Sequence, residues 1–198
     1  MADIEQIKVL RQKTGVSLRK CKKALNETDG DIEEAQKLLR EWGQEVADKR
    51  SDKEVGEGVV ASYVHSDNKT GVLLDLRCET DFVAKGDDFK ELAHELCLQI
   101  AAAKPEYITE DDVDKKDLEN EREIIMNQIE EDEKNSQKPD HVKEKIVEGR
   151  MGKFMEKKVL MNQKWVKEDS KTIEDLVGEY LAKIGENIEV KRFTRYEI

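Results

Sequence analysis

The first 43 residues carry apolar positions at helical spacing in three successive segments. A capping box at Asp3 and Gln6 can begin the first helix, and Gly15 can end it. The second helix is predicted from Ser17 to near Gly30, and the third from a further capping box at Asp31. The apolar faces consist of Ile4, Ile7 and Leu10, then Leu18, Cys21 and Leu25, then Ile32, Ala35, Leu38, Leu39 and Trp42. Together they predict a three-helix module over residues 1–43.

Residues 44–56 are almost wholly polar and charged, which is typical of a solvated connector. We expect this connector to begin as a helix. It places the first domain boundary between a module at 1–43 and a larger domain at 57–198.

The larger domain opens with two segments of strand character, 59–64 and 72–78, on either side of a turn-rich stretch at 66–71. They predict a β-hairpin. Between Asp87 and Lys104 the apolar residues return to helical spacing, and Pro105 ends the run. We expect this helix to pack on the hairpin.

The region of about 110–148 holds 15 acidic and 7 basic residues and so supplies most of the net charge of −11. Its narrow apolar seam predicts two partly exposed helices joined around Pro139, with Thr109 and Asp112 as a possible cap. A last helix is expected from Ser170 or Thr172 to Gly185, and a third strand from 188 to 196. The predicted class is α+β: the three-helix module is followed along the chain by a core of a small antiparallel sheet packed with helices.

Composition narrows the function classes. Charged residues form 41% of the chain, and the acidic balance argues against direct nucleic-acid binding, which needs clustered Lys and Arg. No segment approaches the ~20 apolar residues of a membrane helix or resembles a signal peptide. Cys21, Cys78 and Cys97 form no Cys-x-x-Cys pair and indicate reduced thiols. We expect a soluble, cytoplasmic protein with a protein partner.

Candidate chemistry is sparse. Gly56 and Gly58 lack the surrounding residues of a phosphate-binding loop. His94 and Cys97, three positions apart on one helix, could begin a metal site. Cys78 and His65 are the one plausible nucleophile and base for a hydrolase. Both readings are weak, so we expect no enzyme activity, catalytic residues, metal or cofactor.

One segment does not fit a plain structural pattern. Residues 78–85, Cys-Glu-Thr-Asp-Phe-Val-Ala-Lys, lie between a strand end and a helix start. In a structural interpretation Asp81 caps a turn and Phe82 with Val83 packs under the helix as a hydrophobic staple. In a functional one, a rigid turn presents a carboxylate beside an aromatic ring to a partner.

Several of these segments resemble one family. The resembling stretches are Leu10-Arg11, Thr14-Gly15, Cys21-Lys22-Lys23-Ala24-Leu25, Gly30-Asp31, Ala35, Leu39-Arg40, Thr80-Asp81-Phe82-Val83-Ala84-Lys85, Ile100 to Tyr107, Val147 to Met151 and Lys183 to Ile188. In combination they are similar to elongation factor Ts over nearly the whole chain. The length is similar to the short forms, which have one core repeat and can pair as homodimers.

The resemblance implies a ubiquitin-associated-like (UBA-like) module, an α+β core, and the GTPase domain of EF-Tu as partner. It implies guanine-nucleotide exchange without covalent chemistry, with Thr80, Asp81, Phe82 and Val83 at the contact. Asp81 and Phe82 would intrude near the partner's Mg²⁺ site.

The resemblance also implies contacts from Arg11, Leu18 and Lys22 in the N-terminal module. Burial within that module is the alternative for Leu18. A solvated charged face is the alternative for Arg11 and Lys22.

Departures from the family pattern exist. Lys164-Trp165 stands where Pro-Phe is usual, Leu18-Arg19 replaces a Met-Met pair, and Gly86 replaces Asn. The sequence ends at Ile198, before the glycine-containing tail that many members carry. A UBA-like adaptor without exchange activity is the runner-up function, and it would use residues 1–43 alone.

Overall fold

The computed structural model describes residues 3–50 and 53–198. It divides into two compact units, Met1–Ala101 with Glu174–Ile198, and Ala102–Ile173. Within the predicted connector 44–56, positions 51–52 lie outside the described residues. The division of the chain at residues 43 and 56 stays a prediction.

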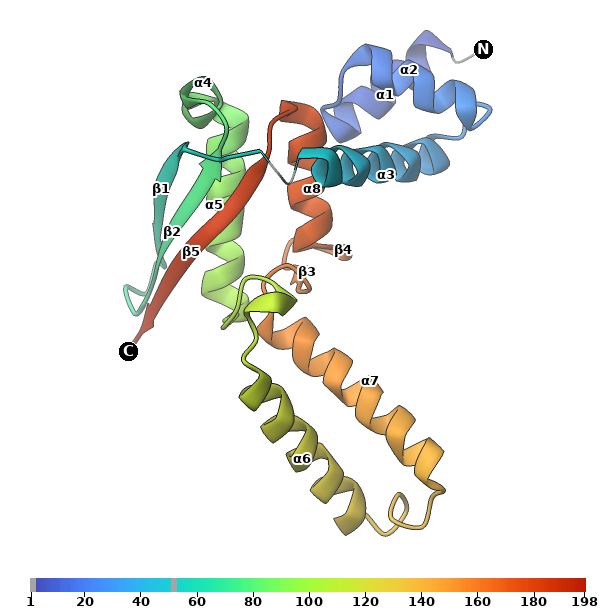
Figure 1. Ribbon diagram of the computed structural model, residues 1–198. Helices are drawn as coiled ribbons and strands as arrows, with labels where there is room; N and C mark the ends of the chain where they lie inside the picture. Colours follow the sequence, from blue (N-terminus) through green and yellow to red (C-terminus); the bar gives the residue numbers. More distant parts are fainter. Residues whose placement is uncertain (1–2, 51–52) are drawn as a thin grey trace. The chain divides into compact units, whose positions relative to one another are not determined.

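Three helices form the N-terminal module as predicted: α1 (Ile4–Thr14), α2 (Leu18–Glu27) and α3 (Ile32–Arg50) (Figure 1). Asp3 and Gln6 form the expected capping box, and Ser17 and Asp31 accept hydrogen bonds from the first turns of α2 and α3. The helix α3 continues past Gly43, in agreement with a helical start to the connector. The module encloses a small core, and its arrangement is consistent with a UBA-like fold. The buried residues of this core are Ile7, Leu10, Val16, Cys21, Ala24, Leu25, Ala35 and Leu39.

The sheet contains β1 (Glu57–Val64), β2 (Thr70–Cys78) and β5 (Ile188–Glu197), all antiparallel, in the order β1-β2-β5. Alternation along β2 buries Val72, Leu74 and Leu76 and leaves Leu73 about half exposed. The helix α5 (Asp87–Ala103) runs along the buried face of this sheet (Figure 1). The predicted hairpin, its covering helix and the third strand are therefore confirmed.

The second unit contains an antiparallel helical hairpin of α6 (Lys115–Glu131) and α7 (Asp140–Lys158) (Figure 1). Ile125, Ile129 and Val147 form its small core. Ion pairing between Arg122 and Glu144 links the exposed surfaces of the two helices. Thr109 and Asp112 cap a short 3-10 helix, η1 (Glu110–Asp112), instead of α6. The two partly exposed helices joined around Pro139 are confirmed.

Of the two residues predicted to start the last helix, Thr172 directly precedes it, whereas the alternative start at Ser170 is wrong. Residues 168–172 form a strand, β4 (Glu168–Thr172), which pairs with β3 (Lys164–Trp165). Ser170 bonds to the Glu168 side chain within that strand and caps no helix. The helix α8 (Ile173–Ile184) follows, ending as predicted before Gly185 at φ 84°. No helix among the described residues has the length and apolar character needed to cross a membrane.

Candidate functional site

The turn after β2 forms a one-turn helix, α4 (Asp81–Lys85), instead of an open loop. Thr80 is its N-cap, since the Thr80 hydroxyl accepts a hydrogen bond from the Val83 N–H at 3.4 Å. The interpretation that gave the capping role to Asp81 is therefore wrong. The Phe82 side chain is 83% exposed, so it does not pack as a hydrophobic staple. This short helix presents an aromatic ring to solvent.

Asp81 precedes this ring and is also exposed. Lys85, one helical turn later, donates a hydrogen bond to Asp81 Oδ2 at 2.7 Å. This bond and the Lys85 charge hold the pKa of the Asp81 carboxyl below its ordinary value. Asp81 is therefore ionised at neutral pH. Because an exposed ion pair contributes little stability, another cation can replace Lys85 at small cost.

The N-cap of α4 is tied to the segment that follows α8. Glu186 accepts hydrogen bonds from the Thr80 N–H at 3.0 Å and from the Thr80 hydroxyl at 2.7 Å. Glu79 accepts one from the Asn187 N–H at 2.7 Å. We call Glu79, Thr80, Glu186 and Asn187 the clasp. No pattern in the sequence marked Glu79, Glu186 or Asn187 as site residues, although they flank the paired ends of β2 and β5.

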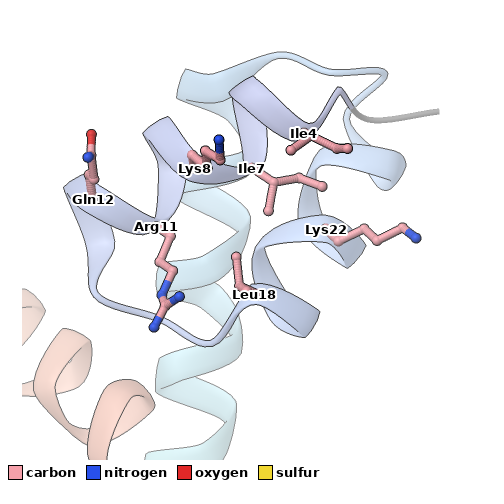
Figure 2. Close-up of a pocket in the computed structure, with 7 residues that line it drawn as sticks. All are labelled: Ile4, Ile7, Lys8, Arg11, Gln12, Leu18 and Lys22. Atoms are coloured by element: carbon pink, nitrogen blue, oxygen red, sulfur yellow. The ribbon is translucent and has the colours of Figure 1, made fainter.

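The three residues expected to bind from the N-terminal module line one groove between α1 and α2. Figure 2 shows Arg11 and Leu18 on the same side of the module, with Lys22 reaching outward from α2. The groove has a volume of about 600 Å³. Leu18 is 49% exposed, so it is not a residue of the module's core. The groove is lined by Ile4, Ile7, Lys8, Arg11, Gln12, Leu18 and Lys22.

This groove combines apolar and cationic character. Ile4 is 70% exposed at one side of it, while Ile7 is buried and forms its floor. Lys8, Arg11 and Lys22 surround these apolar groups. An apolar patch rimmed by one sign of charge is typical of a protein-binding surface, here one suited to an acidic partner.

The alternative chemistry finds no support in the geometry. Cys78 ends β2, whereas His65 follows β1 at the opposite end of the hairpin, beyond the pair Val64 and Gly71. The structure therefore keeps the two apart. His65 Nδ1 is instead hydrogen-bonded to the Tyr63 hydroxyl at 2.9 Å.

The environments of the cysteines also argue against a role as a nucleophile or as a metal ligand. Burial raises the pKa of the Cys78 thiol, and it raises that of Cys97 to about 11. Cys97 is buried while His94 is exposed, and no three metal-ligating side chains gather within residues 3–50 and 53–198. The free cysteines in these ranges are buried, which leaves little access for a substrate or an ion.

Comparison with known proteins identifies the family of the chain. A family model described as Elongation factor TS matches residues 5–198. The chain belongs to the elongation factor Ts family. It is 48% identical over 195 residues to elongation factor Ts of Thermotoga neapolitana, covering 98% of this chain and 96% of that one. Elongation factor Ts of Thermosipho melanesiensis is 44% identical over 198 residues, covering 100% and 99%.

Membership of the elongation factor Ts family makes the chain a translation elongation factor by relationship. The relatives cover both units, so the family match is not confined to the three-helix module. The exposed turn at α4 lies within the matched range, and so does the groove between α1 and α2 except for Ile4.

Proposed function

We propose that this protein binds the GTPase domain of EF-Tu and promotes GDP release during polypeptide elongation in the cytoplasm. The observation that carries the proposal is the 83% exposed Phe82 ring beside an ionised Asp81 on an anchored helical turn. An exposed aromatic ring contributes nothing to the core of its own protein. It is well suited to enter a pocket of a partner, where aromatic anchors commonly dominate binding.

The mechanism is reciprocal linkage. A factor that prefers nucleotide-free EF-Tu must weaken GDP binding, and GDP must weaken the factor by the same ratio of affinities. No covalent bond is made or broken, so the protein acts as an exchange factor and not as an enzyme of covalent chemistry. It needs no cofactor of its own.

Asp81 and Phe82 have separate roles in this proposal. The Phe82 ring separates elements of the partner near its nucleotide, and the Asp81 carboxylate competes for the Mg²⁺ ion that holds the phosphates. Hard oxygen ligands of this kind suit Mg²⁺. The exposed Lys85 pair is exchanged on docking, because it contributes little stability in the unbound protein. Thr80 and Val83 complete the contact.

The groove between α1 and α2 supplies a second contact. Leu18 and Ile4 offer apolar surface, and Arg11 and Lys22 offer charge for the acidic side chains of the partner. Two contact regions in one protein raise affinity and restrict the orientation of docking. Direct contact with nucleic acid is not part of this function.

We also propose a reversible homodimer through the sheet. The sheet ends in the edge strands β1 and β5, and a second copy can cover their unpaired backbone groups. The sheet face away from α5 adds exposed apolar side chains at Val60, Val64 and Tyr196. The free cysteines of the described residues are buried, so the dimer should not respond to reductant on gel filtration.

The experiment is a pull-down from bacterial lysate with the tagged protein, with and without excess GDP. We expect a band of EF-Tu size that GDP displaces. Retention of that band in excess GDP would contradict the linkage. Capture of other proteins through the groove alone, unaffected by Phe82→Ala, would favour the adaptor function.

A further inference from the structure

The pairing between β2 and β5 continues beyond its last backbone partners. The ladder of Cα partners ends at Cys78 and Ile188. Extending the same antiparallel register places residue 79 opposite 187 and residue 80 opposite 186. These two pairs are the clasp, in which side chains take over from the backbone. The clasp therefore extends the sheet to the N-terminus of α4.

The bonds of the clasp are reciprocal. From one side, the Thr80 N–H and hydroxyl both donate to the Glu186 carboxylate. From the other, the Asn187 N–H donates to the Glu79 carboxylate. The carboxylates occupy the role that main-chain carbonyls have in an ordinary ladder. Hydrogen bonds to an ionised acceptor are stronger than those to a neutral carbonyl.

Thr80 has each of its polar groups engaged. Besides its bonds to Glu186, its hydroxyl accepts from the Val83 N–H. Its carbonyl accepts from the Cys78 thiol at 3.2 Å and from the Ala84 N–H at 3.1 Å. A five-residue helix cannot be stable alone, because helix nucleation is unfavourable. The order of α4 must come from such anchors.

We propose that Glu186 is a positioning residue that fixes the N-cap of α4, so that Asp81 and Phe82 are held in one orientation before the partner binds. This inference rests on the proposed exchange function and adds a residue that does not touch the partner. If the turn were loose, only a fraction of molecules would present the ring correctly, and the apparent affinity would be the intrinsic affinity multiplied by that fraction.

The position of Glu186 supports this role over a purely stabilising one. Its carboxylate accepts two hydrogen bonds, and both come from Thr80, the N-cap of α4. The core beneath is formed by other groups, with Ile188 and Val190 of β5 buried against the helices. Loss of the Glu186 carboxylate should therefore loosen α4 and leave the sheet in place.

The test uses the full-length protein with Glu186→Ala, the similarly sized Glu186→Gln, and Glu189→Ala as a matched control. Gln keeps one oxygen that can accept from Thr80. Glu189 lies three residues further along, and its ion-pair partner is Lys191. Three quantities are measured well below each melting temperature: amide hydrogen exchange of residues 82–86, and the half-saturating concentration and maximal rate of fluorescent GDP release from EF-Tu.

For Glu186→Ala we expect roughly tenfold faster amide exchange at residues 82–86 and a roughly tenfold higher half-saturating concentration, with the maximal rate within about twofold of wild type. Glu186→Gln should lie between Ala and wild type, and Glu189→Ala should match wild type. If the Ala variant does not fold, the same shifts in Glu186→Gln decide the matter.

Unchanged half-saturation in a folded Glu186 variant, with active wild type, would overturn the positioning role alone. Unchanged amide exchange at residues 82–86 would overturn it as well, because the turn would then be ordered without the clasp. A wild-type protein that does not accelerate GDP release would refute the exchange function itself and the positioning role with it.

Discussion

Replacing Phe82 with Ala separates a contact with a partner from a contact within the protein. The ring is 83% exposed, so its removal leaves no cavity in the structure. Surface substitutions of this kind change the free energy of unfolding by about 0.5 kcal/mol or less. Replacing a buried Phe with Ala would instead lower the free energy of unfolding by about 3–5 kcal/mol. The melting temperature of Phe82→Ala should therefore stay close to that of wild type.

The effect on exchange should be much larger. Truncation of an aromatic anchor in an interface commonly costs ~2 kcal/mol or more, and each 1.4 kcal/mol is a factor of about ten. Phe82→Ala should therefore slow catalysed GDP release by at least ~10-fold. Asp81→Ala should act in the same direction, since it removes the carboxylate that competes for the partner's cation. Because the pKa of Asp81 is lowered, its carboxyl stays ionised around neutral pH, and its contribution to GDP release should not change with pH there.

The assay is release of fluorescent GDP from EF-Tu at fixed Mg²⁺, with a thermal melt of each variant. Ile124 on α6 is also an exposed apolar residue, with 50% of its surface accessible to solvent. Ile124→Ala is therefore the matched control and should behave as wild type. Normal exchange by folded Phe82→Ala would refute the proposed contact. A large fall in its melting temperature would show instead that the ring packs within the protein.

Three further predictions concern other parts of the chain. Leu18→Asp, at a half-exposed position in the groove, should weaken binding of EF-Tu in calorimetry by roughly tenfold with little change in melting; unchanged affinity would remove the groove from the contact. Because burial raises their pKa values, the thiols of Cys21, Cys78 and Cys97 stay protonated at pH 8 and should react slowly with Ellman's reagent until the protein unfolds; fast reaction of the native protein would contradict this. Ile129→Ala should destabilise the α6–α7 hairpin by about 2–5 kcal/mol, seen as faster amide exchange across 115–158, and normal protection would show that its core is not needed.

The fold could be predicted in most of its elements because local signals agreed with tertiary structure. Asp3 with Gln6 begins α1 as the capping box requires, and Gly15 and Gly185 end α1 and α8 with positive φ. The strand-like segments on either side of the turn at 66–71 predicted the hairpin correctly. The wrong start at Ser170 occurs where a strand pairing overrides a cap signal. Ser170 resembles a helix cap, but the residues around it pair with Lys164 and Trp165.

The site was harder to predict than the fold. The stretch 80–85 could be singled out, but its spacing fitted a staple as well as an exposed anchor. Only the exposure of Phe82 separates these interpretations. Glu186 lies more than 100 residues from Thr80, and no local pattern links them. Their contact depends on the register in which β2 pairs with β5. The sequence of β2 alone does not specify that register, because it also depends on the strand with which β2 pairs.

The most direct test of the central claim is the rate of fluorescent GDP release from EF-Tu, measured as a function of the concentration of this protein at fixed Mg²⁺ with excess unlabelled GDP. We expect the rate to rise with concentration and to saturate as the complex forms. A release rate that stays at the value for EF-Tu alone at every concentration would contradict the exchange function.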